Sequence, residues 1–133
     1  MKLFTKEQKS KLLKNGSAEN RGKDHKPVVK LFTPDANCTW LLSEIDSENL
    51  DLAFGLCDLG MGYPELGYVS ITELSSIRGK FGLPVERDIC FEGKYPLSHY
   101  NEAAYIKDCI STNPILLEQI AEANLKKPKN SFK

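Results

Sequence analysis

The stretch that decides the fold runs Leu52-Ala-Phe-Gly-Leu-Cys-Asp-Leu59 and continues into Gly60-Met-Gly-Tyr-Pro64. Its first eight residues carry apolar side chains at both odd and even positions, so an extended backbone places apolar groups on both faces. Such a strand is typical of the interior of a sheet. The cluster of glycine and proline then ends it. We therefore predict a central strand over Leu52 to Leu59 that leads into a glycine-shaped turn.

The rest of the chain supplies further strands and several capped helices. We expect strands at Val28 to Thr33, Cys38 to Ile45, Gly67 to Ser70 and Val85 to Phe91, the last at an edge because charged residues interrupt it. Capping residues predict helices at Lys6 to Asn15, Ile71 to Phe81, Ser98 to Ile110 and from Pro114 onward. The caps are Thr5 with Gln8, Ser70 with Glu73, Ser98, and Asn113. The sequence thus predicts an α+β fold, with an antiparallel sheet of four or five strands and three or four helices packed largely on one face.

The length of 133 residues suits one domain, and an apolar share of 41% suits a packed core. We find no linker and no internal repeat. We therefore expect a single domain over residues 1–125, followed by a basic, flexible tail over residues 126–133.

Charge and cysteine usage exclude several classes of protein. The 18 basic and 18 acidic residues cancel, so whole-molecule charge attracts neither nucleic acid nor membrane. No run approaches the roughly twenty apolar residues of a membrane span, and the first residues lack a secretory pattern. The four cysteines form no metal-binding pair, which predicts free thiols in the cytoplasm and no metal knuckle. No helix opens directly after Gly60-Met-Gly62, so we expect no nucleotide cofactor.

The glycine-rich turn is the best candidate for a functional surface, and its candidate residues are Asp58, Gly60, Gly62, Tyr63 and Glu65. A carboxylate at each end of the turn could approach the other across an antiparallel strand pair. A metal site, a general acid and base pair or a recognition turn would then be chemically possible. The alternative is that the glycines only shape the turn and that both carboxylates are solvated or bond backbone amides.

Two further candidates, His25 and Asp35, lie in loops and could add to such a site. The basic residues near the N-terminus offer another possibility, because Arg21, Lys23 and Lys26 could contact phosphates together with the Lys-rich tail. Aromatic residues that would stack on bases are not interleaved with them. Solvated surface faces therefore remain the favoured explanation of this basic segment.

Several distinctive short segments of this sequence are similar to those of a known bacterial family. These segments include Asp24-His-Lys-Pro-Val-Val-Lys-Leu-Phe-Thr-Pro-Asp35, Thr39-Trp-Leu-Leu, Phe54-Gly-Leu-Cys-Asp-Leu-Gly-Met-Gly, Glu65-Leu-Gly-Tyr-Val-Ser and Leu83-Pro-Val-Glu-Arg-Asp88. In this order, from Met1 to about Pro96, they resemble domain of unknown function 2958 (DUF2958). The resemblance implies a small accessory protein of plasmids, integrative elements and phages. It implies no catalytic residues.

Three hypotheses of function follow. The first is a non-enzymatic, protein-binding or regulatory module of a mobile genetic element that contacts its partner through the turn. The second is a metal-dependent hydrolase or nuclease that uses Asp58 and Glu65, with His25 or Asp35 as additions. The third is a nucleic-acid-binding protein that uses its two basic ends.

Overall fold

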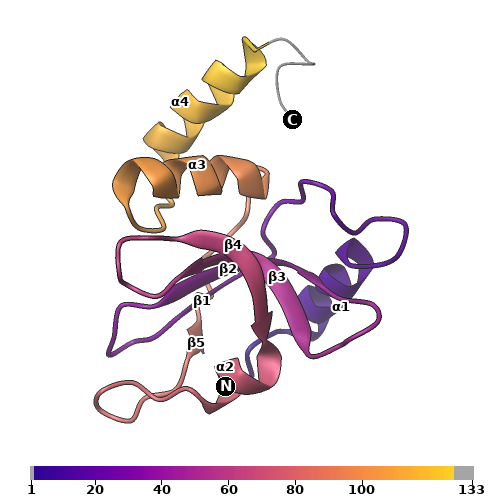
Figure 1. Ribbon diagram of the computed structural model, residues 1–133, viewed down its shortest axis with the longest axis vertical. Coiled ribbons are helices and arrows are strands. Elements are labelled where there is room, and N and C mark those ends of the chain that lie inside the picture. The colour runs from indigo at the N-terminus through magenta and orange to yellow at the C-terminus, as the bar shows by residue number, and fades with distance from the viewer. Residues whose placement is uncertain (1, 128–133) are drawn as a thin grey trace.

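A computed structural model describes residues 2–127 of the chain. It contains one antiparallel sheet in the order β4-β3-β2-β1-β5, together with four helices (Figure 1). The elements in chain order are α1 (Lys6–Asn15), β1 (Val29–Phe32), β2 (Thr39–Ile45), β3 (Leu52–Asp58), β4 (Glu65–Ser70), α2 (Ile71–Ser76), β5 (Glu86–Arg87), α3 (Leu97–Lys107) and α4 (Pro114–Leu125). The predicted α+β class is confirmed. Residues 128–133 of the predicted tail lie outside the described part.

The strand over Leu52–Asp58 is interior, as its sequence predicts. β3 pairs with β2 on one side and with β4 on the other. Leu56 belongs to the apolar cluster on one face of the sheet, and Ala53 belongs to the cluster on the opposite face. This strand therefore anchors both layers of the core.

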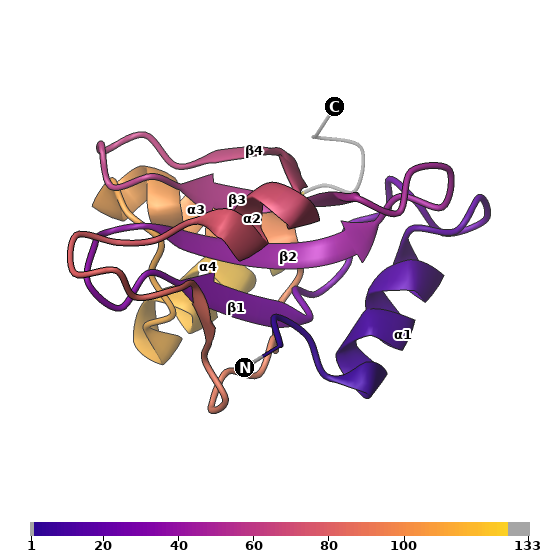
Figure 2. The ribbon, with the colours of Figure 1, turned by 90° about the horizontal axis from the view of Figure 1, so that it is seen from below.

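The helices cover both faces of the sheet, so the prediction that they pack largely on one face is wrong. Leu12 of α1 and Leu74 of α2 join the cluster that contains Leu42, whereas α3 and α4 join the cluster that contains Leu41 (Figures 1 and 2). Leu41 and Leu42 are neighbours in β2 and point to opposite faces, and both are fully buried. Each face therefore needs its own cover.

Helix α1 matches its prediction at both ends and docks on an irregular point of β2. Thr5 and Gln8 form the expected capping box. A β-bulge between Leu42 and Glu44 disturbs the β2–β3 register, and the Ser43 carbonyl accepts a hydrogen bond of 3.0 Å from the Asn15 side chain. A Cβ on Gly16 would come within 1.8 Å of the Ile45 carbonyl oxygen. The close contact of α1 with β2 therefore requires glycine at this position.

Helix α2 is shorter than predicted, because a distant carboxylate holds the segment that follows it. The helix ends at Ser76, and the backbone of residues 79–83 turns back to form a bridge between Arg78 and Pro84. The Asp35 carboxylate accepts hydrogen bonds from the backbone of Phe81 at 2.6 Å and of Leu83 at 3.3 Å. This contact spans more than forty residues, so local helical periodicity does not reveal it.

Helix α3 begins one residue before its predicted cap. Pro96 occupies the N-cap position, and the Ser98 hydroxyl donates instead to the Asp24 carboxylate, which also accepts the Ser98 backbone N–H at 3.0 Å. β5 lies at the sheet edge, as expected, but has only two residues. No helix within residues 2–127 has both the length and the apolar composition needed to cross a membrane.

Candidate functional site at the glycine-rich turn

Asp58, at the end of β3, is a buried structural carboxylate. Its side chain is on the face covered by α3 and α4, and the residue is 4% exposed. One carboxylate oxygen accepts the Gly60 N–H at 2.8 Å, and the other accepts the Ile110 N–H at 2.9 Å. Asp58 thus joins the β3–β4 turn to the segment that connects α3 with α4. The interpretation in which this carboxylate bonds backbone amides applies here.

Gly60 brings the β3–β4 turn against the β1–β2 turn. Its φ of +79° is in the left-handed region, and a Cβ would lie 2.7 Å from the Asn37 Cβ. Gly62 also has a positive φ, of +86°, but a Cβ there would meet no atom within 4 Å. The glycines therefore have different roles: Gly60 permits close packing of two turns, whereas Gly62 only permits the backbone to reverse.

The three connections at this end of the sheet enclose an open hollow of about 630 Å³. Its walls come from the β1–β2 turn, from the β3–β4 turn through Gly60 and Gly62, and from Asp108 to Ile110 between α3 and α4. Lys30 and Asp88, 3.5 Å apart, line another side as an ion pair. Asp58 and Asp108 also line the hollow, so its lining has three carboxylates against the one amine of Lys30.

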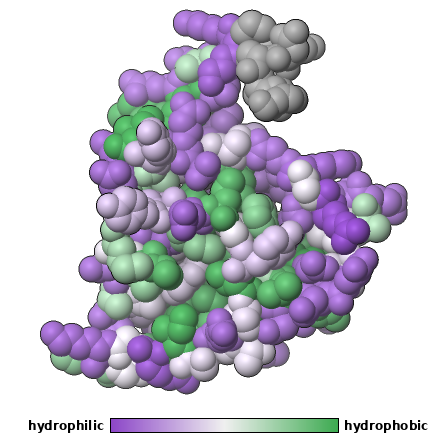
Figure 3. Space-filling view, viewed as in Figure 1, coloured by the Kyte–Doolittle hydropathy of each residue, from purple (hydrophilic) through white to green (hydrophobic). Residues whose placement is uncertain are grey.

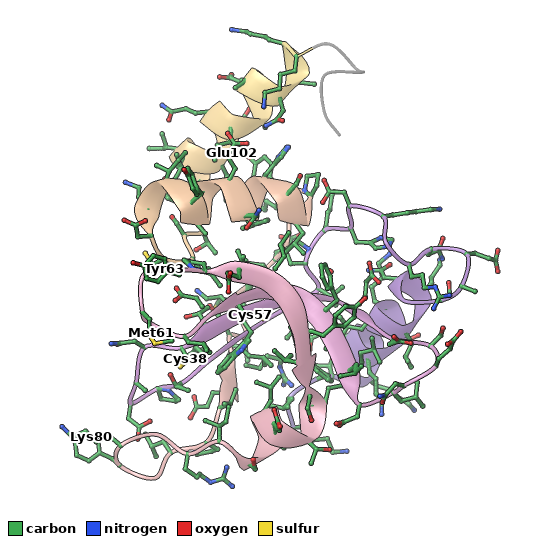
Figure 4. The ribbon with its side chains drawn as sticks, in the orientation of Figure 1. Cys38, Cys57, Met61, Tyr63, Lys80 and Glu102 are labelled. Carbon is green, nitrogen blue, oxygen red and sulfur yellow. The ribbon has the colours of Figure 1, made fainter. Side chains whose placement is uncertain are left out.

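Between the glycines, the turn presents large apolar side chains to solvent. Met61 is 69% exposed and Tyr63 is 82% exposed, and the adjacent Leu59 is exposed as well. Met61 and Tyr63 lie at the outer end of the β3–β4 hairpin, whereas Cys57 lies within the sheet (Figure 4). Tyr63 was among the predicted site residues, whereas Leu59 and Met61 were not. The available signal was the alternation of large apolar residues with glycines in a turn too tight to bury them.

The second carboxylate of the turn, Glu65, does not converge with Asp58. Glu65 pairs with Cys57 in the β3–β4 register, so its side chain shares the face of Cys57, while Asp58 points to the other face. Burial, together with the nearby Glu65 charge, raises the pKa of the Cys57 thiol to about 11. Cys57 is therefore an un-ionised, half-buried group at neutral pH. The approach of the two carboxylates that the sequence allowed does not occur.

His25 lies near the far end of β2, close to Glu44 rather than to the turn. Its Nε2 is 2.7 Å from the Asn20 carbonyl oxygen and 3.9 Å from a Glu44 carboxylate oxygen. Glu44 also accepts the Gly22 N–H at 3.2 Å, and burial raises the pKa of its carboxyl. Thr39 pairs with Asp58, and Glu44 lies five residues further along β2, so the Glu44 and Asp58 carboxylates are separated by roughly 16 Å along the strand.

The remaining predicted site residue, Asp35, binds the backbone of residues 79–83, as described above. One of its oxygens accepts two backbone N–H groups, and the other is buried without a hydrogen-bond partner. Within residues 2–127, no three His, Cys, Asp or Glu side chains lie close enough to hold a metal ion. The metal-dependent hypothesis therefore lacks a ligand set in the described part of the chain.

The basic residues of the N-terminal loop and of β1 are partly neutralised. Arg21 lies 3.7 Å from a Glu48 carboxylate oxygen, and Lys30 pairs with Asp88. Lys23 and Lys26 are exposed. The segment thus has less free positive charge than its composition indicates.

Comparison with known proteins gives a family but no activity. The family described as "Protein of unknown function (DUF2958)" matches residues 3–111, which extends the resemblance seen in the sequence through α3 and stops before α4. No curated protein and no solved structure matches the chain. Because the match covers most of the 133 residues, the chain belongs to the DUF2958 family of proteins of unknown function.

Proposed function

We propose that this protein is a non-enzymatic binding module that holds a protein partner at the turn end of the sheet. The contact surface consists of the β3–β4 turn over residues 59–64 and the hollow beside it. The observation that carries the proposal is the exposure of Leu59, Met61 and Tyr63 on a turn that Asp58 and Gly60 fix in place. Because the turn backbone is already fixed, it loses little conformational entropy when a partner covers its apolar side chains.

The uncharged composition of residues 59–64 favours a protein partner over a charged ligand. Exposed aromatic residues and Met are enriched at the centres of protein interfaces, where charged residues are scarce. Asp58 and Glu65, the two carboxylates first considered for catalysis, lie on opposite faces of the sheet, and His25 lies at its other end. The turn itself offers the partner apolar side chains and glycine backbone.

The setting we propose is the one that the family resemblance implies. The protein would act as an accessory factor of a bacterial plasmid, integrative element or phage, and its partner would come from the host or from the element. The support for this setting is the resemblance, and the support for the binding surface is the turn geometry.

Affinity capture with the purified protein tests the proposal. Wild-type protein immobilised through its N-terminus should retain a specific protein from bacterial lysate, and Met61→Ser/Tyr63→Ser should lose it. The retained protein is then purified and titrated by calorimetry. We expect the double variant to weaken binding by at least about thirtyfold, since each removed anchor contributes about 1 kcal/mol or more.

The chain offers a closely matched control. Tyr105 is 86% exposed and Ile115 is 71% exposed, close to Tyr63 and Met61, but they lie on α3 and α4. Tyr105→Ser/Ile115→Ser should retain the partner with unchanged affinity. Equal loss of binding in both double variants, or retention in both, would remove the turn from the proposal.

A further inference from the structure

The free edge of β4 is the most open hydrogen-bonding surface of the sheet. β4 pairs with β3 through six consecutive residue pairs without a bulge, and within residues 2–127 no strand pairs with its other side. The peptide groups on that side can pair with another chain. Natural edge strands usually prevent this by short length, bulges, proline or lysine. β4 is six residues long, and Glu65 is its only charged residue.

The opposite edge of the same sheet has the protection that β4 lacks. β5 has only two residues, and both Glu86 and Arg87 are charged. The Arg87 guanidinium also donates a hydrogen bond of 2.7 Å to the Lys2 carbonyl, which ties the N-terminal segment to this edge. The sheet therefore has one guarded edge and one unguarded edge.

The side chains of β4 also distinguish this edge from the β5 edge, because two of them are large, apolar and exposed. Leu66 and Tyr68 are exposed although they point to the face that α3 and α4 cover elsewhere. The Tyr68 ring lies 5.1 Å from that of Phe54 in β3 and is 61% exposed. Figure 3 shows hydrophobic surface over the middle of the molecule, where β4 lies in Figure 1. An additional strand beside β4 would cover this surface.

We propose that β4 pairs antiparallel with β4 of a second copy of this chain, about a twofold axis at Gly67. Antiparallel partners share a face, so this register places Leu66 opposite Tyr68 of the other copy and Glu65 opposite Val69. No two like charges face each other. A Cβ built on Gly67 meets no atom within 4 Å, so the sheet face at Gly67 is open beside the proposed axis. The two sheets would continue into one.

A second copy is the occupant that the residues favour. Pairing about Gly67 is self-complementary, as a twofold interface requires. The formal net charge of the chain is zero, so two copies do not repel at long range. The interface uses Leu66 and Tyr68 rather than the turn residues Met61 and Tyr63. It therefore goes beyond the proposed partner binding and can fail or succeed independently of it.

Sedimentation velocity tests the association. The wild-type protein should show a reversible dimer as its concentration rises to on the order of 300 μM, as a small interface predicts. Leu66→Lys/Tyr68→Lys places lysine opposite lysine in the proposed register and should raise the dissociation constant tenfold or more. Ile89→Lys/Tyr105→Lys, at exposed positions outside β4, is the matched control and should leave it unchanged. A wild-type monomer throughout, or a dimer that survives the β4 double variant, overturns the proposal.

Cross-linking tests the register without disturbing apolar contacts. In a Cys90→Ser/Cys109→Ser background, which removes the two exposed thiols, Gly67→Cys places one thiol on each side of the proposed axis. A short bismaleimide should join two copies at least tenfold faster than in the same background with Tyr105→Cys. Equal rates would overturn the pairing about Gly67. The Met61→Ser/Tyr63→Ser variant should cross-link as fast as its parent, which keeps this test separate from the partner experiment.

Discussion

The two ends of the sheet each contain a buried carboxylate, and the two carboxylates are treated differently. At the turn end, both oxygens of Asp58 accept backbone N–H groups, one from the turn and one from Ile110. At the other end, Glu44 accepts one N–H, from Gly22, and lies 3.9 Å from His25. Asp58 fixes a turn that presents apolar side chains to solvent, whereas Glu44 closes a loop over the end of β2.

This difference indicates which end of the sheet is better suited to bind a partner. A partner that covers exposed apolar groups gains most when the groups are already held in place. The turn end has such support in Asp58 and Gly60. The His25 end is occupied by its own loop and leaves fewer large apolar side chains exposed.

The largest expected effect comes from removing the Asp58 carboxylate. Asp58→Ala removes the carboxylate that accepts hydrogen bonds from the Gly60 and Ile110 N–H groups, which should lower the free energy of unfolding by about 3 kcal/mol. Urea denaturation measures this change. Glu65→Ala, at the exposed carboxylate of the same turn, should shift it by less than about 0.5 kcal/mol. Similar losses in the two variants would show that Asp58 does not fix the turn.

Substitutions of the turn glycines should also lower the free energy of unfolding, but by less than Asp58→Ala does, and more at Gly60 than at Gly62. Gly60→Ala strains a left-handed residue and presses its Cβ against Asn37, so we expect a loss of about 2 kcal/mol. Gly62→Ala has the strain without the contact and should lose about 1 kcal/mol. Urea unfolding of both variants decides this. A greater loss at Gly62 would contradict the packing of the two turns.

At the other end, the effect should depend on pH. Burial raises the pKa of the Glu44 carboxyl above its ordinary value of 4.5, against the opposing effects of the Gly22 hydrogen bond and His25. The folded state therefore binds this proton more tightly than the unfolded state. The contribution of the protonated Glu44 carboxyl to the free energy of unfolding is fully present below pH 4.5. It is lost as the pH rises through the pKa of Glu44 in the folded state.

Glu44→Gln should remove this dependence. The unfolding free energy of the variant, relative to wild type, should rise between about pH 4 and pH 7 as the wild-type carboxyl ionises. Urea titrations at several pH values give the difference directly. A constant difference over this range would show that Glu44 does not titrate differently on folding.

Local sequence signals predicted the sheet well because strands and caps depend on near neighbours. The capping box of Thr5 and Gln8 and the cap at Asn113 are local, and both occur as predicted. The turn after Asp58 follows from its glycines. The sequence of β3 also showed that both of its faces are apolar. Two apolar faces should have implied helices on both sides of the sheet. That consequence was missed.

The errors arose where distant residues decide the local conformation. Asp35 holds residues 79–83 and shortens α2, and Asp24 binds Ser98 at the start of α3. Likewise, Asp58 is buried because Ile110, fifty-two residues later, donates to it. The glycine-rich turn connects two strands, as predicted, but the opposite orientations of Asp58 and Glu65 depend on strand register. Register was not part of the prediction.

Hydrogen exchange of the complex with the captured partner tests the central claim most directly. Amide exchange, followed by mass spectrometry, compares residues 59–64 with residues 20–25 in the free and bound protein. We predict slower exchange in the turn on binding and no change in the loop that carries His25. Protection of residues 20–25 with an unchanged turn would contradict the assignment of the binding surface to the turn end.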